Sequence, residues 1–263
     1  MKLHTLAYTA GLIDGDGHIG VSRFRRKDTG CMTYCVDVNV TNNSVPLVNW
    51  LVLHFGGVVK KYISTAGNPY SVWCCRGKEA QKSFLGAVMP YLCIKRKYAE
   101  CVLEFLSLEG ECPEKRASIW ENRRALQQMK SVTTDTQNVF DRTDKLQMAY
   151  LAGMIDTDGH ISKSQGYWMV GATNINKHAL MTMKNTFGGS LWGVNRVTNR
   201  VPCFGYAVHG TKIVERILLS IIPYLIVKRD SAIKALTELR KGPMIQSELT
   251  GDSESDLVGT LAS

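Results

Sequence analysis

The sequence predicts an α+β fold of two pseudo-symmetric halves, each an αββαββα unit with a four-stranded antiparallel sheet. The first observation is a repeated segment: residues 6–17 read LAYTAGLIDGDG and residues 148–159 read MAYLAGMIDTDG. The second is that three later landmarks recur in the same order: TN at 41–42 and 173–174, FGG at 55–57 and 187–189, and PYL at 90–92 and 223–225. A repeat sustained over this length indicates an internal duplication.

Local signals place the same elements in each copy and are clearest in the first. Apolar residues at 34, 36, 38 and 40 alternate with more polar ones, which is typical of a strand with one buried face. A helix is predicted over Val45 to Phe55, with Ser44 as its N-cap and Gly56 at its end. Residues 58–63 and 71–76 are predicted to form a hairpin, and residues 78–89 a helix that Pro90 stops. Each sheet should therefore pack one face on helices and expose the other.

The repeat also sets the predicted boundaries. The N-terminal half spans residues 1–106 and the C-terminal half residues 144–242. Residues 107–143 have no counterpart and are predicted to be a linker with one helix, over 114–130. Residues 243–263 form an acidic tail that is predicted to be disordered. The offset between the copies falls from 142 to 132 before Thr41, so the first copy should have the longer first hairpin.

Composition narrows the class of partner. Lys and Arg number 32 against 23 Asp and Glu, a basic balance that favours a nucleic acid. The eight cysteines include no CxxC pair, which favours reduced thiols over a zinc site or a disulfide framework. The chain has no apolar run long enough to span a bilayer and no signal-peptide pattern, so no membrane association and an intracellular location are expected.

Small residues form a stripe on each copy of the motif. On a helix over residues 5–16, Ala7, Gly11 and Gly15 share one face, and Ala149, Gly153 and Thr157 share the equivalent face in the second copy. Small residues let two helix backbones approach closely. The two motif helices are therefore predicted to pack on each other, and the two halves, satisfied by one another, to form a monomer with no obligate protein partner.

Acidic residues end both motif helices: Asp14 and Asp16 in the first copy, Asp156 and Asp158 in the second. A helix C-terminus already carries partial negative charge, so four carboxylates there need an offset, and a hard divalent cation is the natural one. Facing carboxylates that share metal ions can form a centre that cleaves phosphodiesters. The pattern thus predicts a Mg²⁺ site between the halves.

At these residues the chain resembles the LAGLIDADG homing endonucleases of the single-chain, two-motif type. The strings AGLIDGDG and AGMIDTDG resemble the two signature motifs, and the likeness extends through both halves. The resemblance implies a saddle formed by both sheets, double-stranded DNA lying along it, and a Mg²⁺-dependent endodeoxyribonuclease that uses a metal-activated water. It also implies a double-strand break with short 3′ overhangs at a long asymmetric target. Mn²⁺ is expected to substitute for Mg²⁺, and Ca²⁺ to allow binding without efficient cleavage.

The resemblance also implies roles for individual residues. The metal ligands would be Asp16 and Asp158, with the backbone carbonyls of Gly15 and Thr157. Asp14 and Asp156 would serve local structure. The remaining catalytic residues would be a polar pair and a lysine pair: Asn42 and Asn174, and Lys95 and Lys228. The shorter Asn stands where the family often has Gln.

Base recognition is expected from the exposed sheet faces, because a two-stranded β-ribbon fits the major groove. The predicted DNA contacts of the first half are Ser22, Arg26, Thr33, Asp37, Asn39, Lys61 and Arg76. Those of the second half are Gln165, Asn195, Arg196, Arg200 and His209. A register slip of one residue would move any of these side chains to the other face.

Two other functions fit the same fold. An RNA maturase would bind an intron, and a non-catalytic protein would bind DNA without cutting it. Loss of an acid from one motif would favour the maturase, but both motifs keep their acids. An added DNA-binding module would favour the non-catalytic protein, and none is evident in the sequence. The family resemblance alone suggests an organelle, a chloroplast or a mitochondrion, as the location.

Overall fold

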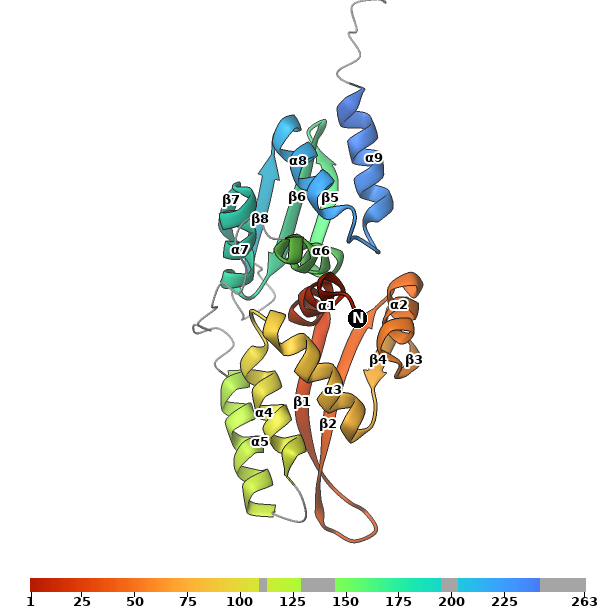
Figure 1. Ribbon diagram of the computed structural model, residues 1–263, viewed down its shortest axis with the longest axis vertical. Coiled ribbons are helices and arrows are strands. Elements are labelled where there is room, and N and C mark those ends of the chain that lie inside the picture. The colour runs from red at the N-terminus through yellow and green to blue at the C-terminus, as the bar shows by residue number, and fades with distance from the viewer. Residues whose placement is uncertain (109–112, 129–144, 195–202, 242–263) are drawn as a thin grey trace, which may run out of the picture.

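The computed structural model describes residues 1–108, 113–128, 145–194 and 203–241. Two halves lie end to end and meet at two helices near the centre (Figure 1). The first half comprises α1 (Leu3–Asp16), β1 (Gly17–Arg25), β2 (Met32–Asn42), α2 (Val45–Phe55), β3 (Val58–Ile63), β4 (Pro69–Cys75), α3 (Lys78–Val88), a 3₁₀ turn (Met89–Tyr91), α4 (Arg96–Ser107) and α5 (Pro113–Gln128). The second comprises α6 (Lys145–Asp158), β5 (Gly159–Ser164), β6 (Tyr167–Asn174), α7 (Lys177–Phe187), β7 (Ser190–Val194), β8 (Cys203–His209), α8 (Thr211–Ile221) and α9 (Arg229–Arg240).

Each half contains one four-stranded antiparallel sheet, and the two sheets have equivalent topologies. Their strand orders are β1-β2-β4-β3 and β5-β6-β8-β7. The predicted αββαββα order is confirmed in both halves, and each adds a further helix, α4 or α9. The first hairpin is longer in the first half, as the offset between the repeats predicts.

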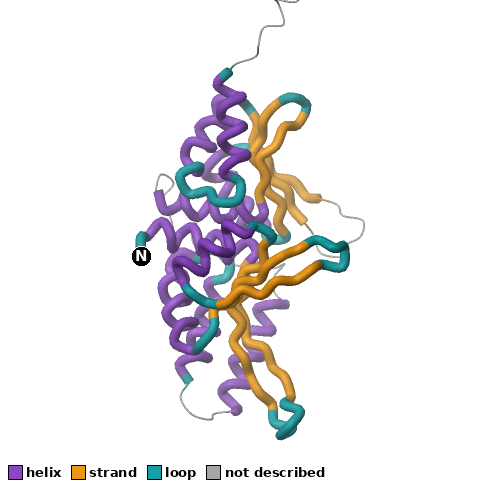
Figure 2. Tube along the Cα trace, turned by 90° about the vertical axis from the view of Figure 1, so that its right-hand side faces the viewer, coloured by secondary structure: helices purple, strands orange, loops and turns teal. Residues whose placement is uncertain are grey.

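Helices cover one face of each sheet, and the other, which we call the open face, carries none (Figure 2). The alternation in β2 follows this division. Val36, Val38 and Val40 are buried under the helices, while Asp37 and Asn39 lie on the open face and are only partly buried. The hydrophobic core therefore lies between helices and sheet in each half.

Local capping signals fix the helix ends. The Ser44 hydroxyl accepts a hydrogen bond from the backbone N–H of Leu47 and starts α2, and Gly56 ends it at φ 65°. Only glycine adopts this backbone conformation at little cost, so α2 stops where the sequence predicts. Within the described residues, no helix has the length and apolar character required to cross a membrane.

The helix predicted inside the linker is present as α5, and it packs on α4 and β1 of the first half. Ile119 is buried, and the Arg23 guanidinium stacks over the Trp120 ring at 4.2 Å from its centroid. The rest of the predicted linker, and the tail from residue 242, lie outside the described residues.

The two halves are joined by direct contact between the backbones of α1 and α6. A Cβ atom at Gly11 would collide with the carbonyl oxygen of Tyr150, and one at Gly153 with the carbonyl oxygen of Tyr8. Ala7 and Ala149 are fully buried. The predicted packing of the two small-residue stripes on each other is thus confirmed.

Candidate active site

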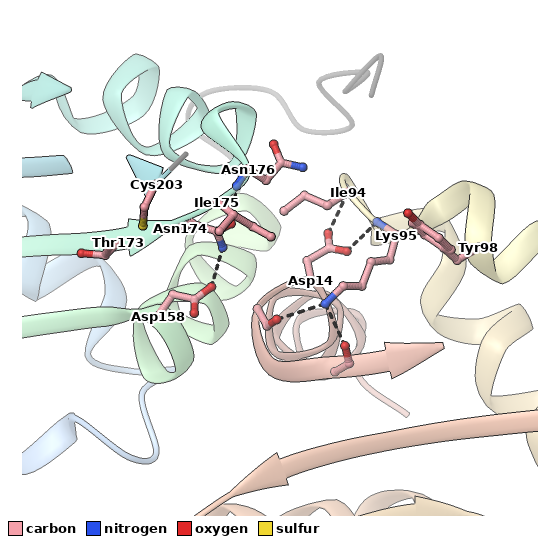
Figure 3. Close-up of a pocket in the computed structure, with 12 residues that line it drawn as sticks. Asp14, Ile94, Lys95, Tyr98, Asp158, Thr173, Asn174, Ile175, Asn176 and Cys203 are labelled. Carbon is pink, nitrogen blue, oxygen red and sulfur yellow. Dashed lines mark hydrogen bonds between the residues drawn. The ribbon is translucent and has the colours of Figure 1, made fainter. Parts of the chain in front are cut away.

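Both motif helices end at the open side of the molecule, and a strand follows each without an intervening turn. Gly17 and Gly159 allow this change of direction, because a Cβ atom there would lie 2.5 Å and 2.7 Å from the Cα atoms of Ile13 and Ile155. The helix ends face each other: the Asp158 carboxylate lies 3.3 Å from where a Cβ atom of Gly15 would be. A cavity of about 410 Å³ opens between them, lined by residues of both halves (Figure 3).

The inner acid of each motif is buried and saturated with hydrogen bonds. Asp14 accepts the backbone N–H groups of residues 93–95 at 2.8 to 3.0 Å, and Asp156 accepts those of residues 226–228 at 2.7 to 3.1 Å. Each also accepts a tyrosine hydroxyl from the other half: Tyr150 donates to Asp14 at 2.9 Å and Tyr8 to Asp156 at 2.7 Å. Burial raises the pKa of Asp14, and the Lys95 charge and these N–H groups oppose the rise. The inner acids therefore hold the loops before α4 and α9 against the seam.

The outer acids, Asp16 and Asp158, are available to solvent and are held by the two asparagines. The amide nitrogen of Asn42 donates to Asp16 at 3.2 Å, and that of Asn174 donates to Asp158 at 2.6 Å. Each amide oxygen accepts a backbone N–H two residues later, from Ser44 or Asn176. Because the oxygen is engaged by a backbone donor, the amide nitrogen must point to the carboxylate.

Electrostatic repulsion acts between the outer acids. The pKa of Asp158 is raised to about 6: partial removal from water and the negative charge of Asp16 raise it, and Asn174 and the two lysines partly oppose the rise. The pKa of Asp16 is raised by the same loss of hydration and is lowered by Asn42, Lys95 and Lys228. Asp16 is the more exposed of the two. The protein thus holds two carboxylates in a place that disfavours their ionisation.

The two lysines sit beside these acids and cap the helix ends. The Lys95 ammonium donates to the carbonyl oxygens of Ile13, Gly15 and Gly17 at 2.7 to 3.0 Å, and that of Lys228 donates to the carbonyl of Asp156 at 2.6 Å. Terminal helix carbonyls have no partner within their own helix, so a cation there is stabilising. Burial lowers the pKa of Lys228, and the charges of Asp156, Asp16 and Asp158 oppose this.

The donor set fits a hard divalent cation. Within the described residues, no three side chains of His, Cys, Asp or Glu gather into a site, so a closed tetrahedral cage of the zinc type is not formed there. Mg²⁺ instead uses one or two carboxylates and completes its shell with water and substrate phosphates. Asp16 and Asp158, which repel each other, are the carboxylates that fit. The Gly15 carbonyl, a predicted ligand, already accepts a hydrogen bond from Lys95.

The sequence matches no family model and no curated protein, but the fold has clear structural relatives. The LAGLIDADG homing endonuclease I-GzeII, in complex with its DNA target, superposes with a TM-score of 0.64 at 12% identity over 94% of this chain and 93% of that one. I-SmaMI, bound to uncleaved DNA target in the presence of calcium ions, gives 0.61 at 19% identity over 90% and 92%. The LAGLIDADG homing endonuclease I-LtrWI, bound to target DNA, gives 0.58 at 16% identity over 90% of each chain.

The chain has the LAGLIDADG homing endonuclease fold. In this fold the described structure brings together all six residues predicted to be catalytic, at the ends of α1 and α6. The asparagines reach the carboxylates directly, so their short side chains suffice for this contact.

The LAGLIDADG sheets place most of the predicted DNA-contact residues on the open face. Strand register assigns Ser22, Thr33, Asp37, Asn39 and His209 to it, and Arg76 follows β4 in the same phase. Arg26 and Gln165 lie in hairpin turns, where Arg26 forms an ion pair with Asp28. Placing Lys61 on the open face was wrong: it pairs with Ser71 on the face that carries the buried Trp73. Asn195, Arg196 and Arg200 lie outside the described residues.

Several open-face residues of this LAGLIDADG fold were not predicted. Lys60 occupies the place expected for Lys61, because residues of a strand alternate between faces. His18 and His160 lie on the open face as the second residues of β1 and β5, next to the motif acids. Trp192 is exposed on β7. The phases of β3 and β7 are set by pairing with β4 and β8, so no signal within residues 58–63 distinguishes Lys60 from Lys61.

Proposed function

We propose that this protein is a site-specific DNA endonuclease that cuts both strands of a long, asymmetric target and leaves short 3′ overhangs. The observation that carries the proposal is the pair of outer acids, Asp16 and Asp158. Two equivalent helices bring them to the seam between the halves, each with its own asparagine and lysine, and the charge of Asp16 raises the pKa of Asp158. Two such sets, one from each half, suit the cleavage of two antiparallel strands.

The energetic cost of this arrangement supports a functional role. The inner acids are stabilised by backbone N–H groups and tyrosine hydroxyls, whereas the outer acids lie close enough for the charge of Asp16 to raise the pKa of Asp158. Perturbed carboxylates in a cavity are typical of functional sites. Asp16 and Asp158, with the backbone carbonyls of Gly15 and Thr157, would hold Mg²⁺. When bound, the cation would offset phosphate charge and supply a nucleophile at neutral pH by lowering the pKa of a water.

The chain's own residues have separate tasks in this proposal. Asn42 and Asn174 fix the orientation of the two carboxylates. Lys95 and Lys228 place a positive charge where negative charge develops on the phosphate during attack, which lowers the barrier. Both ammonium groups are held by helix carbonyls, so their positions are set before substrate arrives.

DNA is the proposed substrate because both open faces lie on one side of the molecule (Figure 2) and the chain carries a net charge of +9. The structural relatives were solved with DNA targets, and this supports the same ligand here. The seam is completed within one chain, so we propose a monomer. We further propose that Mn²⁺ can replace Mg²⁺, and that Ca²⁺ permits binding without efficient cleavage.

The test is selection of cleaved sites from a random duplex library in Mg²⁺, followed by cleavage of a supercoiled plasmid that bears the selected site. Asp16→Asn keeps the shape of the side chain and removes its charge. It should slow linearisation by at least about a hundredfold, the scale of a lost electrostatic contribution, while gel-shift affinity is retained. Asp230→Asn, which changes an exposed acid in the first turn of α9, should leave cleavage unchanged. Linearisation by Asp16→Asn at the wild-type rate would refute the proposal.

A further inference from the structure

The two open faces differ in chemistry although their backbones are equivalent. In the first half, Asp37, Asn39, Lys60 and Arg76 surround a hollow of about 180 Å³. In the second half, no Asp, Glu, Lys or Arg of the described strands lies on the open face, by strand register. Its side chains there include Tyr167, Met169 and Trp192 together with the uncharged polar groups of Ser162, His160 and His209.

Trp192 occupies the position that Lys60 has in the first half. Lys60 pairs with Val72, which pairs with Thr41; Trp192 pairs with Gly205, which pairs with Thr173. The duplication thus provides an internal comparison. The fold accepts a lysine at this position, so the sheet does not require a tryptophan there.

The pairing with glycine gives the indole ring a defined seat. A Cβ atom at Gly205 would lie 2.6 Å from the Trp192 ring, so the ring covers the backbone of Gly205. The valine that stands at the equivalent place in the first half would displace it. The Trp192 residue is still 46% exposed, on the sheet face that is directed away from the helices.

The row that contains Trp192 leads into the active-site cavity. Thr173, its neighbour across β8, lines that cavity together with Asn174 and Asp158 (Figure 3). A duplex that reached the outer acids would therefore pass over the indole. Tryptophan combines a large apolar ring with a polar N–H group and is enriched at binding interfaces.

We infer that Trp192, seated on Gly205, reads the 5-methyl group of a thymine in the major groove of the half-site that faces the second sheet. This methyl is the apolar group that a base edge presents in the major groove, and apolar side chains recognise it. At the equivalent position the first sheet, with Lys60 in place of Trp192, reads a hydrogen-bonding edge instead. The inference rests on the proposed function and specifies which half of the protein reads which chemistry.

The first part of the test is a binding selection with the full chain in Ca²⁺, so that enrichment does not depend on cleavage. Wild type is compared with Trp192→Ala and with Trp192→Lys, which introduces the residue of the first half. Trp192→Ala should relax preference at one base pair, and that pair should carry thymine in the wild-type selection. Trp192→Lys should shift it to guanine, whose O6 and N7 accept from lysine.

The second part replaces that thymine with deoxyuridine, which lacks only the methyl group and still stacks. Wild-type affinity should fall about fourfold, as expected for one buried methyl group, and the affinity of Trp192→Ala should not change. Deoxyuridine at a thymine of the other half-site is the control. Gly205→Val should reproduce Trp192→Ala. If Trp192→Ala does not fold, the deoxyuridine measurement on wild type decides alone.

The outcomes separate the two proposals. If wild type enriches no sequence, both fail. If it enriches a site that binds equally well with deoxyuridine, or if Trp192→Ala relaxes a position other than a thymine or none at all, only the inference fails. Sensitivity to an abasic position without sensitivity to deoxyuridine would assign Trp192 to stacking and overturn methyl recognition.

Discussion

Replacement of Asp158 by Asn should make the protein more stable and inactive at the same time. The pKa of Asp158 is raised from an ordinary 3.8 to about 6, because the folded protein removes hydration from the carboxylate and places Asp16 beside it. The folded state therefore binds the proton more tightly than the unfolded state. The stability contributed by this group is complete below about pH 4 and is lost as the pH rises through about 6.

The size of the effect follows from the shift. Each pKa unit corresponds to about 1.4 kcal/mol, so a shift of two units sets an upper limit near 3 kcal/mol. Asp158 is partly exposed, and solvent screening reduces this to about 1–2 kcal/mol. Asn is uncharged at every pH and can still accept the hydrogen bond from Asn174. The free energy of unfolding of Asp158→Asn should therefore exceed that of wild type by about 1–2 kcal/mol more at pH 7.5 than at pH 4.5.

The assay is urea denaturation in a chelator at both pH values, with plasmid cleavage measured in Mg²⁺. Asp156→Asn is the matched control: it places an amide where three backbone N–H groups and the Tyr8 hydroxyl all donate, so it should lose about 2 kcal/mol or more. A gain for Asp158→Asn that is the same at pH 4.5 and 7.5 would refute the argument from repulsion. Wild-type cleavage by this variant would refute its place in the active site.

Two further predictions concern the seam and the lysines. Gly153→Ala drives a Cβ atom into the carbonyl of Tyr8 and should lower the free energy of unfolding by at least about 2 kcal/mol. The control Gly86→Ala lies in a helix with open space around it, so its free energy of unfolding should be unchanged or higher by up to about 1 kcal/mol. Equal effects of the two substitutions in urea denaturation would contradict the backbone seam. Lys228→Met should reduce kcat at least about tenfold while DNA affinity changes less than about threefold, because the lysine charge acts on the transition state. The two quantities are measured by single-turnover cleavage and by gel-shift titration. Equal losses in both would make Lys228 a simple phosphate contact.

The sequence predicted elements whose signals are local. The helix at 45–55 begins and ends as predicted because its capping residue and its terminal glycine act on their own backbone. The meeting of Asp16 and Asp158 was also predictable, since two copies of one motif with small-residue stripes leave few other arrangements. The sequence could assign the asparagines to the site, but it could not predict their contact with the carboxylates. That contact depends on the amide oxygen of each asparagine accepting a backbone N–H at the start of the next helix.

Features that depend on register or on distant partners were not predictable. Lys61 was assigned to the open face because nothing in residues 58–63 fixes the phase of the strand, which is set by pairing with β4. The packing of α5 on the first half depends on Arg23 and Trp120, which are far apart in the sequence. The tyrosine hydroxyls that cross the seam are equally non-local, since each completes the hydrogen bonds of the other half's inner acid.

The contact between Gly11 and Gly153 has a consequence for how a protein with this fold and the proposed activity can diversify. Main-chain atoms, rather than adjustable side chains, set the distance between the two helix ends, so the spacing of the outer acids does not vary with substitutions on the sheets. Under the proposed function, the stagger between the two nicks would then be fixed by this backbone contact and would not depend on the target sequence. Open-face residues such as Lys60 and Trp192 could be exchanged to redirect the protein to another target while the geometry of the break stayed the same.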